Sequence, residues 1–200
     1  MDLQALFGNI DIYLFDQLLR GRIRPGMRVL DAGCGGGRNL VYLLREGFDV
    51  HAVDADEEAV ASVRRMAAAI TPARDDRRFL VTGVEAMPFA ESAFDVVISS
   101  AVLHFARDDA HFDRMVGEMW RVLASGGMLF ARLASRIGMA SPLHPVGEGR
   151  FILPDGTTRY VVDEARLHAT TAALGGQLLD PLKTTVVQQQ RCMTTWVIGK

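Results

Sequence analysis

The sequence has little cysteine, little net charge and no long hydrophobic run. Two cysteines, Cys34 and Cys192, cannot build a disulfide framework, and neither belongs to a CxxC pair. A formal net charge of −2 provides no field that would draw the chain onto nucleic acid or anionic lipid. The longest apolar stretch, residues 94–105, is too short and polar to span a bilayer. These absences predict a cytoplasmic protein that works neither on nucleic acid nor in a membrane.

Targeting, repeat and metal-binding signals are also missing. The N-terminus has no basic region followed by an apolar one, and no internal repeat, low-complexity tract or linker follows. The five histidines show no metal-ligand spacing. At 200 residues the chain is long enough to bury one core. We therefore expect a single domain over residues 1–200, monomeric or homodimeric, without a metal site.

Short apolar strands alternate with amphipathic helices through the middle of the chain. Strands that are apolar throughout indicate a parallel sheet covered by helices on both faces, and ligands bind at its carboxyl edge. The pattern therefore predicts a doubly wound α/β fold. The expected strands are 28–31, 50–54, 79–81, 94–99 and 128–133. Three helices are expected between them: one over 39–46, one that Asp56 caps, and one over 112–123, with Gly126-Gly127 ending that unit.

Three further segments flank this alternation. Residues 1–24 form a helical segment, broken at Gly8-Asn9, that we expect to cover the ligand site as a lid. Residues 135–162 form a loop and hairpin insertion that turns at Pro154-Asp155-Gly156. Asp163 caps a last helix, and a closing hairpin over 183–198 adds an antiparallel strand.

A glycine-rich loop follows the first strand and predicts a nucleotide-like ligand. Its backbone N–H groups can approach a ligand that side chains would block. The dinucleotide pattern GxGxxG fits poorly, because Arg38 occupies the place that needs a small residue. Asp31 would repel a pyrophosphate but suits an ammonium or sulfonium group, unless it only caps the loop.

Asp54 lies about twenty residues further, at the end of the second strand. A carboxylate there can accept hydrogen bonds from both hydroxyls of a ribose. The alternative is a cap for the next helix, a role that Asp56 fills better.

Five motifs in register carry a family resemblance. They are VLDAGCGGGRN (29–39), AVD (52–54), VEAMPF (84–89), FDVVIS (94–99) with Leu103-His104, and WRVLASGG (120–127). Together they resemble the class I S-adenosylmethionine (SAM)-dependent methyltransferases, closest to those that methylate small molecules. The resemblance implies a Rossmann-like seven-stranded sheet of order 3-2-1-4-5-7-6 with strand 7 antiparallel. It also implies SAM as cofactor and S-adenosylhomocysteine (SAH) as product.

The resemblance carries roles onto individual residues. The methionine part of SAM would lie at Asp31, Gly33 and Gly35, and the ribose at Asp54. Gly83 departs from the family pattern, which has an acidic residue there that accepts from adenine; Glu85 or a backbone carbonyl substitutes, or the bond is missing. The full expected cofactor set is Asp31, Gly33, Cys34, Gly35, Arg38, Asn39, Asp54, Ala55, Val84, Glu85, Ser99 and Ser100.

Methyl transfer from a sulfonium is an in-line displacement, so the protein mainly positions the acceptor and excludes water. His104 follows the fourth strand and is the candidate base, with packing in the loop as the alternative. Tyr13 on the lid is a second candidate, although aromatic residues at helical spacing are usually core. Arg132 lies within a strand that should be buried, so its charge needs either a partner or a place in the ligand pocket. Arg150 and Arg159 flank the hairpin turn, where they contact either an anionic acceptor or solvent.

Three functions remain open from the sequence. The first is methyl transfer from SAM to a small-molecule acceptor. The second is a non-catalytic SAM-binding module, and the third is a nicotinamide-dependent oxidoreductase, against which Asp31 and Arg38 argue. A macromolecular acceptor is not expected, because no basic stripe or aromatic platform is present.

Overall fold

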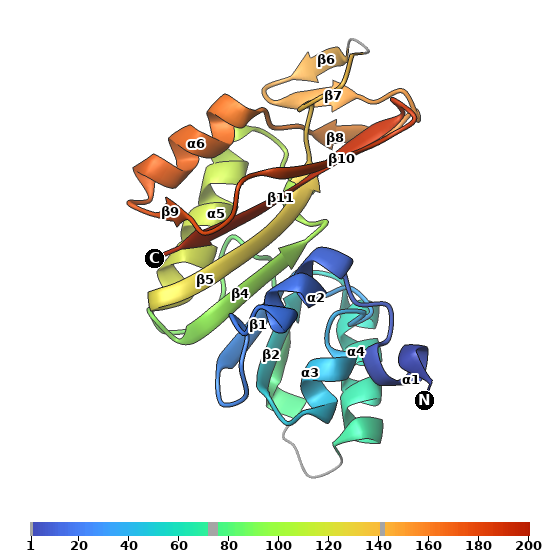
Figure 1. Ribbon diagram of the computed structural model, residues 1–200, viewed down its shortest axis with the longest axis vertical. Helices are drawn as coiled ribbons and strands as arrows, with labels where there is room; N and C mark the ends of the chain where they lie inside the picture. The colour runs from blue at the N-terminus through green and yellow to red at the C-terminus, as the bar shows by residue number, and fades with distance from the viewer. Residues whose placement is uncertain (1, 72–75, 141–142) are drawn as a thin grey trace.

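A seven-stranded mixed sheet forms the centre of the protein, in a computed structural model that describes residues 2–71, 76–140 and 143–200 (Figure 1). The strand order is β10-β11-β5-β4-β1-β2-β3. β11 runs antiparallel to both neighbours, so the predicted order 3-2-1-4-5-7-6 is confirmed. A two-residue strand, β9 (Gln177–Leu178), also pairs with β11. The main strands are β1 (Arg28–Ala32), β2 (Asp49–Asp54), β3 (Phe79–Val81), β4 (Phe94–Ser100), β5 (Leu123–Ala134), β10 (Lys183–Val187) and β11 (Arg191–Gly199).

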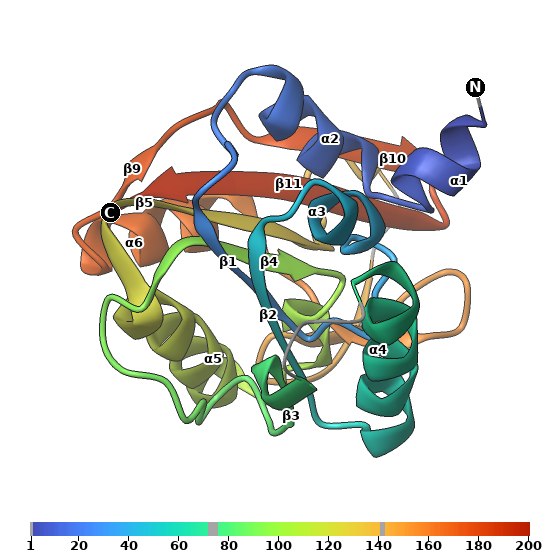
Figure 2. The ribbon, with the colours of Figure 1, turned by 90° about the horizontal axis from the view of Figure 1, so that it is seen from below.

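Helices cover both faces of this sheet (Figure 2). Alternate side chains of β1 enter opposite layers: Val29 packs with the helices α2, α3 and α4, and Leu30 with α5 and α6. The predicted caps Asp56 and Asp163 are confirmed, since each carboxylate accepts a hydrogen bond from the first turn of its helix. The helices are α1 (Leu3–Phe7), α2 (Ile12–Leu19), α3 (Val41–Arg45), α4 (Glu57–Ile70), α5 (Asp109–Val122) and α6 (Glu164–Ala173), with short 3-10 turns η1 (Asp76–Arg78) and η2 (Leu103–Phe105).

The start of β5 differs from the prediction. The sequence predicts that the glycine pair separates the helix from a strand beginning at Met128, whereas β5 begins at Leu123 and contains both glycines. The register against β4 shifts there, so the glycines form a bulge rather than a loop. The C-terminal residue holds the glycines in the strand, because Gly126 N–H donates to the carbonyl of Lys200 at 2.7 Å and Lys200 N–H donates to the carbonyl of Gly127.

The insertion after β5 forms a second, three-stranded antiparallel sheet. The expected hairpin is present as β7 (Arg150–Ile152) and β8 (Thr158–Tyr160), and an unpredicted strand, β6 (His144–Gly147), adds to it. This small sheet lies beyond the carboxyl end of β5, beside the tip of the β10–β11 hairpin (Figure 1). Residues 141–142 of the insertion, and Met1 of the expected lid, lie outside the described residues. No helix in the described ranges combines the length and apolarity needed to cross a membrane.

Candidate active site

The glycine loop adopts a backbone that excludes side chains at its first position. Gly33 has φ +84°, and a Cβ there would stand 2.4 Å from Cγ2 of Val102. The N–H groups of Gly33 and Cys34 both donate to the carbonyl of Val53, at 2.8 and 3.0 Å. The loop is thus fixed against the end of β2. Burial raises the pKa of the Cys34 thiol, which keeps it protonated and unreactive.

Asp54 organises the loop from the end of β2. Its Oδ2 accepts from Gly35 N–H at 2.8 Å, and its Oδ1 accepts from Asp56 N–H at 3.0 Å. Each oxygen still has acceptor capacity, because a carboxylate oxygen carries two lone pairs. Asp54 therefore holds the glycine loop and faces the cavity above it at the same time.

A cavity of about 510 Å³ opens at the carboxyl edge of β1, β2 and β4. It lies where the strand order reverses, between β1 and β4, the usual ligand position in this architecture. All expected cofactor residues line it except Asp31 and Ser99, which are buried beneath it. The lining residues outside the expected set are Gly36, Gly83, Ala101, Val102, Phe105, His111 and Met115, of which Gly36 and Gly83 belong to segments that the sequence analysis assigns to the cofactor.

Asp31 is a buried carboxylate without a hydrogen-bond partner. Its side chain is 1% exposed, and neither oxygen has a donor among the described residues. Burial raises the pKa of Asp31 to about 7; the charge of Arg38 opposes this shift and that of Asp54 adds to it. A cationic donor at the glycine loop would supply the missing partner, so the residue fits the ammonium of an amino-acid group.

Glu85 occupies the space beside Gly83 at the other end of the cavity. A Cβ at position 83 would stand 2.6 Å from Glu85 Oε2, so a larger residue there would displace the flexible end of this side chain. Glu85 Oε1 lies 3.4 Å from Nε2 of His111 on α5. The carboxylate of Glu85 thus lies close to where the side chain of an acidic residue at position 83 would begin.

Asp11, in the segment between α1 and α2, joins three parts of the site. Its side chain is fully buried, and its Oδ2 accepts from Arg132 at 3.1 Å and pairs with Arg38 at 3.4 Å. Ser100 Oγ lies 3.3 Å from the same oxygen and accepts from Arg38 at 2.8 Å. The partner that Arg132 needs is therefore Asp11.

A second cavity, of about 490 Å³, adjoins the first, and Arg38 and Ala101 line both. His104 lines the second cavity, not the first. Burial, followed by the charge of Arg159, lowers the pKa of His104 to about 4, so its imidazole is neutral at physiological pH. Its Nδ1 has no partner among the described residues. No cluster of potential metal ligands occurs in the described ranges.

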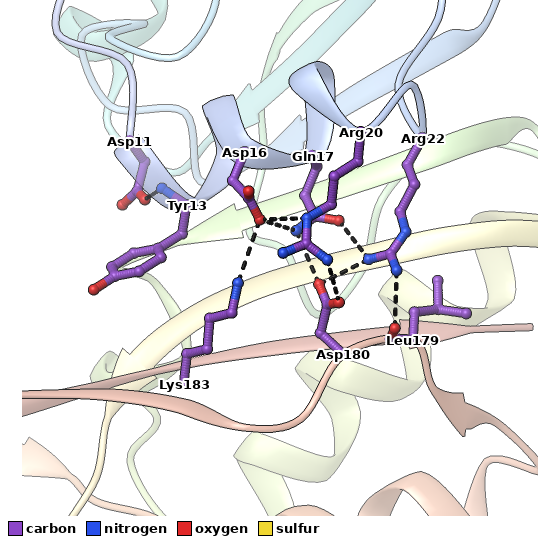
Figure 3. Close-up of polar contacts among 9 residues, drawn as sticks. All are labelled: Asp11, Tyr13, Asp16, Gln17, Arg20, Arg22, Leu179, Asp180 and Lys183. Carbon is purple, nitrogen blue, oxygen red and sulfur yellow. Dashed lines mark hydrogen bonds and ion pairs between the residues drawn. The ribbon is translucent and has the colours of Figure 1, made fainter.

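The N-terminal helix α2 is tied to the chain between β9 and β10 (Figure 3). Asp180 accepts from Gln17, Arg20 and Arg22 at 2.7–3.1 Å, and Asp16 pairs with Lys183. Tyr13, one turn earlier, shares a 2.7 Å hydrogen bond with Thr185 Oγ1. Tyr13 lines neither of the two cavities, so its catalytic role and the lid role of residues 1–24 stay predictions.

Comparison with known proteins assigns the family. A family model described as "Methyltransferase domain" matches residues 30–131. A malonyl-[acyl-carrier protein] O-methyltransferase of Pectobacterium atrosepticum is 34% identical over 54% of this chain and 40% of its own. A ubiquinone biosynthesis O-methyltransferase of Brucella anthropi is 32% identical over 80% of this chain and 64% of its own. The chain thus spans less than two thirds of the length of these relatives.

Solved structures agree with the fold. A SAM-dependent methyltransferase of Methanosarcina mazei superposes with a TM-score of 0.70 at 20% identity, over 92% of this chain and 96% of its own. Together with the family match, the glycine loop and the sheet order, this shows that the chain belongs to the class I SAM-dependent methyltransferases. The cofactor of this class is SAM, and the predictions of family, fold class and cofactor are confirmed.

Proposed function

We propose that this chain transfers a methyl group from SAM to a small-molecule acceptor held in the second cavity. The observation that carries the proposal is the shared wall at Arg38 and Ala101, which brings the acceptor cavity against the cofactor cavity. The malonyl-[acyl-carrier protein] and ubiquinone biosynthesis relatives support an O-methyltransferase with a non-nucleic-acid acceptor. A cavity of about 490 Å³ is in the range of small-molecule sites.

The chain's own residues account for cofactor binding. Asp31 and the loop at Gly33 and Gly35 would hold the amino-acid end, and Asp54 the ribose. Val84 would donate its N–H to the adenine, and Glu85 would accept from the adenine amino group in place of an acidic residue at 83. When bound, SAM supplies an activated methyl group on a cationic sulfur, so the protein needs no nucleophile of its own.

His104 would act on the acceptor rather than on the cofactor. Its neutral imidazole lines the acceptor cavity, and its Nδ1 is buried without a partner, so Nε2 would take the proton from an acceptor hydroxyl as the methyl group arrives. Arg38 and Ala101, which line both cavities, mark the place where the methyl group would pass from the cofactor to the acceptor.

Calorimetry with SAH and NAD, followed by transfer of radioactive methyl from SAM to an acceptor panel, tests this function. We expect SAH to bind, NAD not to bind, and a low-molecular-weight product to be labelled. SAH binding with no labelled product over a wide panel would instead favour a non-catalytic SAM-binding module. Tight NAD binding without SAH binding would contradict the assignment.

A further inference from the structure

The acceptor cavity is lined by cations from segments far apart in the sequence. Arg38 follows the glycine loop, Arg132 lies on β5, Arg159 on β8 and Arg191 on β11. Among the described residues that line this cavity, the only carboxylate is that of Asp155. Even with the adjoining Asp11 counted, positive charge exceeds negative charge around this cavity.

The four arginines differ in how they are neutralised. Arg38 and Arg132 share the buried carboxylate of Asp11. Arg159 and Arg191 form no ion pair within 4 Å of a carboxylate in the described ranges of the chain. Arg159 donates once, to the carbonyl of Thr158, and its guanidinium lies 5.0 Å from the ring centre of Phe105. Since a guanidinium has five N–H donors, most of those on Arg159 remain available to a ligand.

Asp155 does not cancel these charges. Its Oδ1 accepts from both the backbone N–H and the hydroxyl of Thr157, at 2.9 and 2.6 Å, which orients the carboxylate toward the turn of the hairpin. These bonds, and then the charges of Arg159 and Arg191, lower the pKa of Asp155. The ionised carboxylate of Asp155 therefore interacts with Arg159 and Arg191 only at long range, without a direct ion pair to either.

Two of the cation-bearing segments, those of Arg159 and Arg191, lie well outside the region that the family model matches. The family model ends at residue 131, whereas Arg159 belongs to the small sheet and Arg191 to the closing hairpin. Both segments meet at the same cavity, beside His104. The small sheet that carries Arg159 is an insertion into the common cofactor fold, and insertions of this kind are where acceptor selection is expected.

We propose that the second cavity selects an acceptor that carries an oxyanion, a carboxylate or a phosphate, which Arg159 and Arg191 bind directly. This rests on the proposed function, because it names the class of acceptor for the same site. A planar guanidinium matches the geometry of either oxyanion, and pairing it in a concave site is stronger than on an open surface. The bound anion also relieves the repulsion between the arginines that line the cavity.

Matched probes of equal shape test the proposal without knowledge of the natural acceptor. Benzoate and phenyl phosphate carry the charge, and benzamide is the neutral counterpart. Binding to the full chain is measured by NMR shift changes at low salt, with and without SAH, for the wild type, Arg159→Gln, Arg191→Gln and the control Arg150→Gln. Arg150 lies on the same small sheet, but outside the lining of both cavities.

The expected result is binding of one or both anions, with benzamide at least about tenfold weaker. Arg159→Gln and Arg191→Gln should each weaken anion binding about tenfold, and Arg150→Gln should leave it unchanged. The ratio of benzoate to phenyl phosphate affinity distinguishes a carboxylate site from a phosphate site. Added salt should weaken anion binding in the wild type more than in the two cavity variants.

Three results would overturn the proposal: equal binding of benzamide and benzoate, no anion binding, or equal anion affinity in the cavity variants and the control. Unchanged melting temperatures and SAH affinities in the variants show that they are folded. The SAH arm separates the two claims, since a chain that binds anions at Arg159 but never binds SAH contradicts the proposed function alone.

Discussion

The carboxylate of Asp11 and the guanidinium of Arg132 form a 3.1 Å ion pair across 121 residues of sequence. The pair joins the N-terminal segment to the end of β5, between the cofactor cavity and the acceptor cavity. Because Asp11 is fully buried, its ion pairs with Arg132 and Arg38 offset the cost of taking the carboxylate out of water. The N-terminal segment is therefore part of the site as well as a cover for the sheet.

Removal of the Asp11 carboxylate should destabilise the fold and strengthen anion binding. Asp11→Ala deletes the cap of α2 and leaves Arg132 without its carboxylate, which should lower the free energy of unfolding by about 2–4 kcal/mol and Tm by roughly 5–15 °C. Arg38 is 44% exposed, so water compensates part of its loss. Benzoate should bind more tightly, because two cations become available.

Asp2→Ala is the matched control, since Asp2 caps α1 at an exposed position and forms no ion pair with an arginine in the part of the chain that the structure describes. It should cost about 1 kcal/mol or less and leave benzoate binding unchanged. Calorimetry measures both properties. Equal destabilisation by the two substitutions would show that Asp11 acts only as a cap.

Glu85 should be the adenine acceptor that Gly83 lacks. Glu85→Ala should weaken SAH binding by about 1 kcal/mol, and Gly83→Asp alone should also weaken it, because the new carboxylate displaces and repels that of Glu85. The double variant Gly83→Asp/Glu85→Ala should recover affinity. Glu148→Ala, an exposed change on the small sheet, is the control. Calorimetry in which the double variant binds as weakly as Glu85→Ala would contradict this role.

His104 should affect turnover without affecting cofactor binding. His104 lines the acceptor cavity but not the cofactor cavity. His104→Ala should therefore lower kcat with the acceptor by roughly a hundredfold or more, and leave SAH affinity unchanged. His168→Ala, an exposed change on α6, should alter neither quantity. Steady-state kinetics and calorimetry measure the two properties. Wild-type kcat in His104→Ala would remove the base and leave His104 as a packing residue.

The sheet and the cofactor cavity could largely be predicted from the sequence, because local features determine them. Apolar strands of suitable length, the glycine loop and the carboxylate of Asp54 each report on their own few residues. The sequence does not predict His111 as a site residue, because the apolar stripe that identifies its helix begins at Phe112. Its spacing of four from Met115 places both on one helix face, and this was the available signal.

The acceptor cavity could not be predicted in the same way. Arg38, Arg132, Arg159 and Arg191 come from a loop and three strands, and only the folded chain shows that they meet. Arg150 and Arg159 have equivalent places in the hairpin sequence, yet only Arg159 lines the cavity. The β5 bulge was missed for a related reason, since its partner is the distant C-terminus.

Asp31 and His104 should give opposite pH dependences of stability. The pKa of His104 falls from 6.5 to about 4 on folding, so the unfolded chain binds its proton first and stability is lost as pH falls through this window. The pKa of Asp31 rises from 3.8 to about 7, so the folded chain holds its proton longer and stability is lost as pH rises from 4 to 7. Each contribution is at most roughly 3–4 kcal/mol, and the two nearly cancel between pH 4.5 and 6.5.

Two variants separate these contributions. Relative to the wild type, Asp31→Asn should gain stability as pH rises from 4.5 to 6.5, and His104→Gln should lose it over the same range. The double variant Asp31→Asn/His104→Gln should again track the wild type. Urea unfolding at a series of pH values gives the differences. Parallel curves for all four proteins would show that neither group titrates differently in the folded chain.

Gly33 and Gly35 should separate folding from cofactor binding. Both have positive φ, but a Cβ at 33 meets Val102 at 2.4 Å, whereas a Cβ at 35 has no protein atom within 4 Å. Gly33→Ala should therefore cost about 3 kcal/mol of stability, from strain and overpacking together, and Gly35→Ala about 1 kcal/mol.

Because position 35 lines the cofactor cavity, Gly35→Ala should still weaken SAH binding at least about tenfold. Gly33→Ala/Val102→Ala, which removes the two Cγ atoms in the way, should regain part of the stability lost in Gly33→Ala. Thermal unfolding and calorimetry measure the two effects, and wild-type SAH affinity in Gly35→Ala would show that the cofactor does not approach this part of the loop.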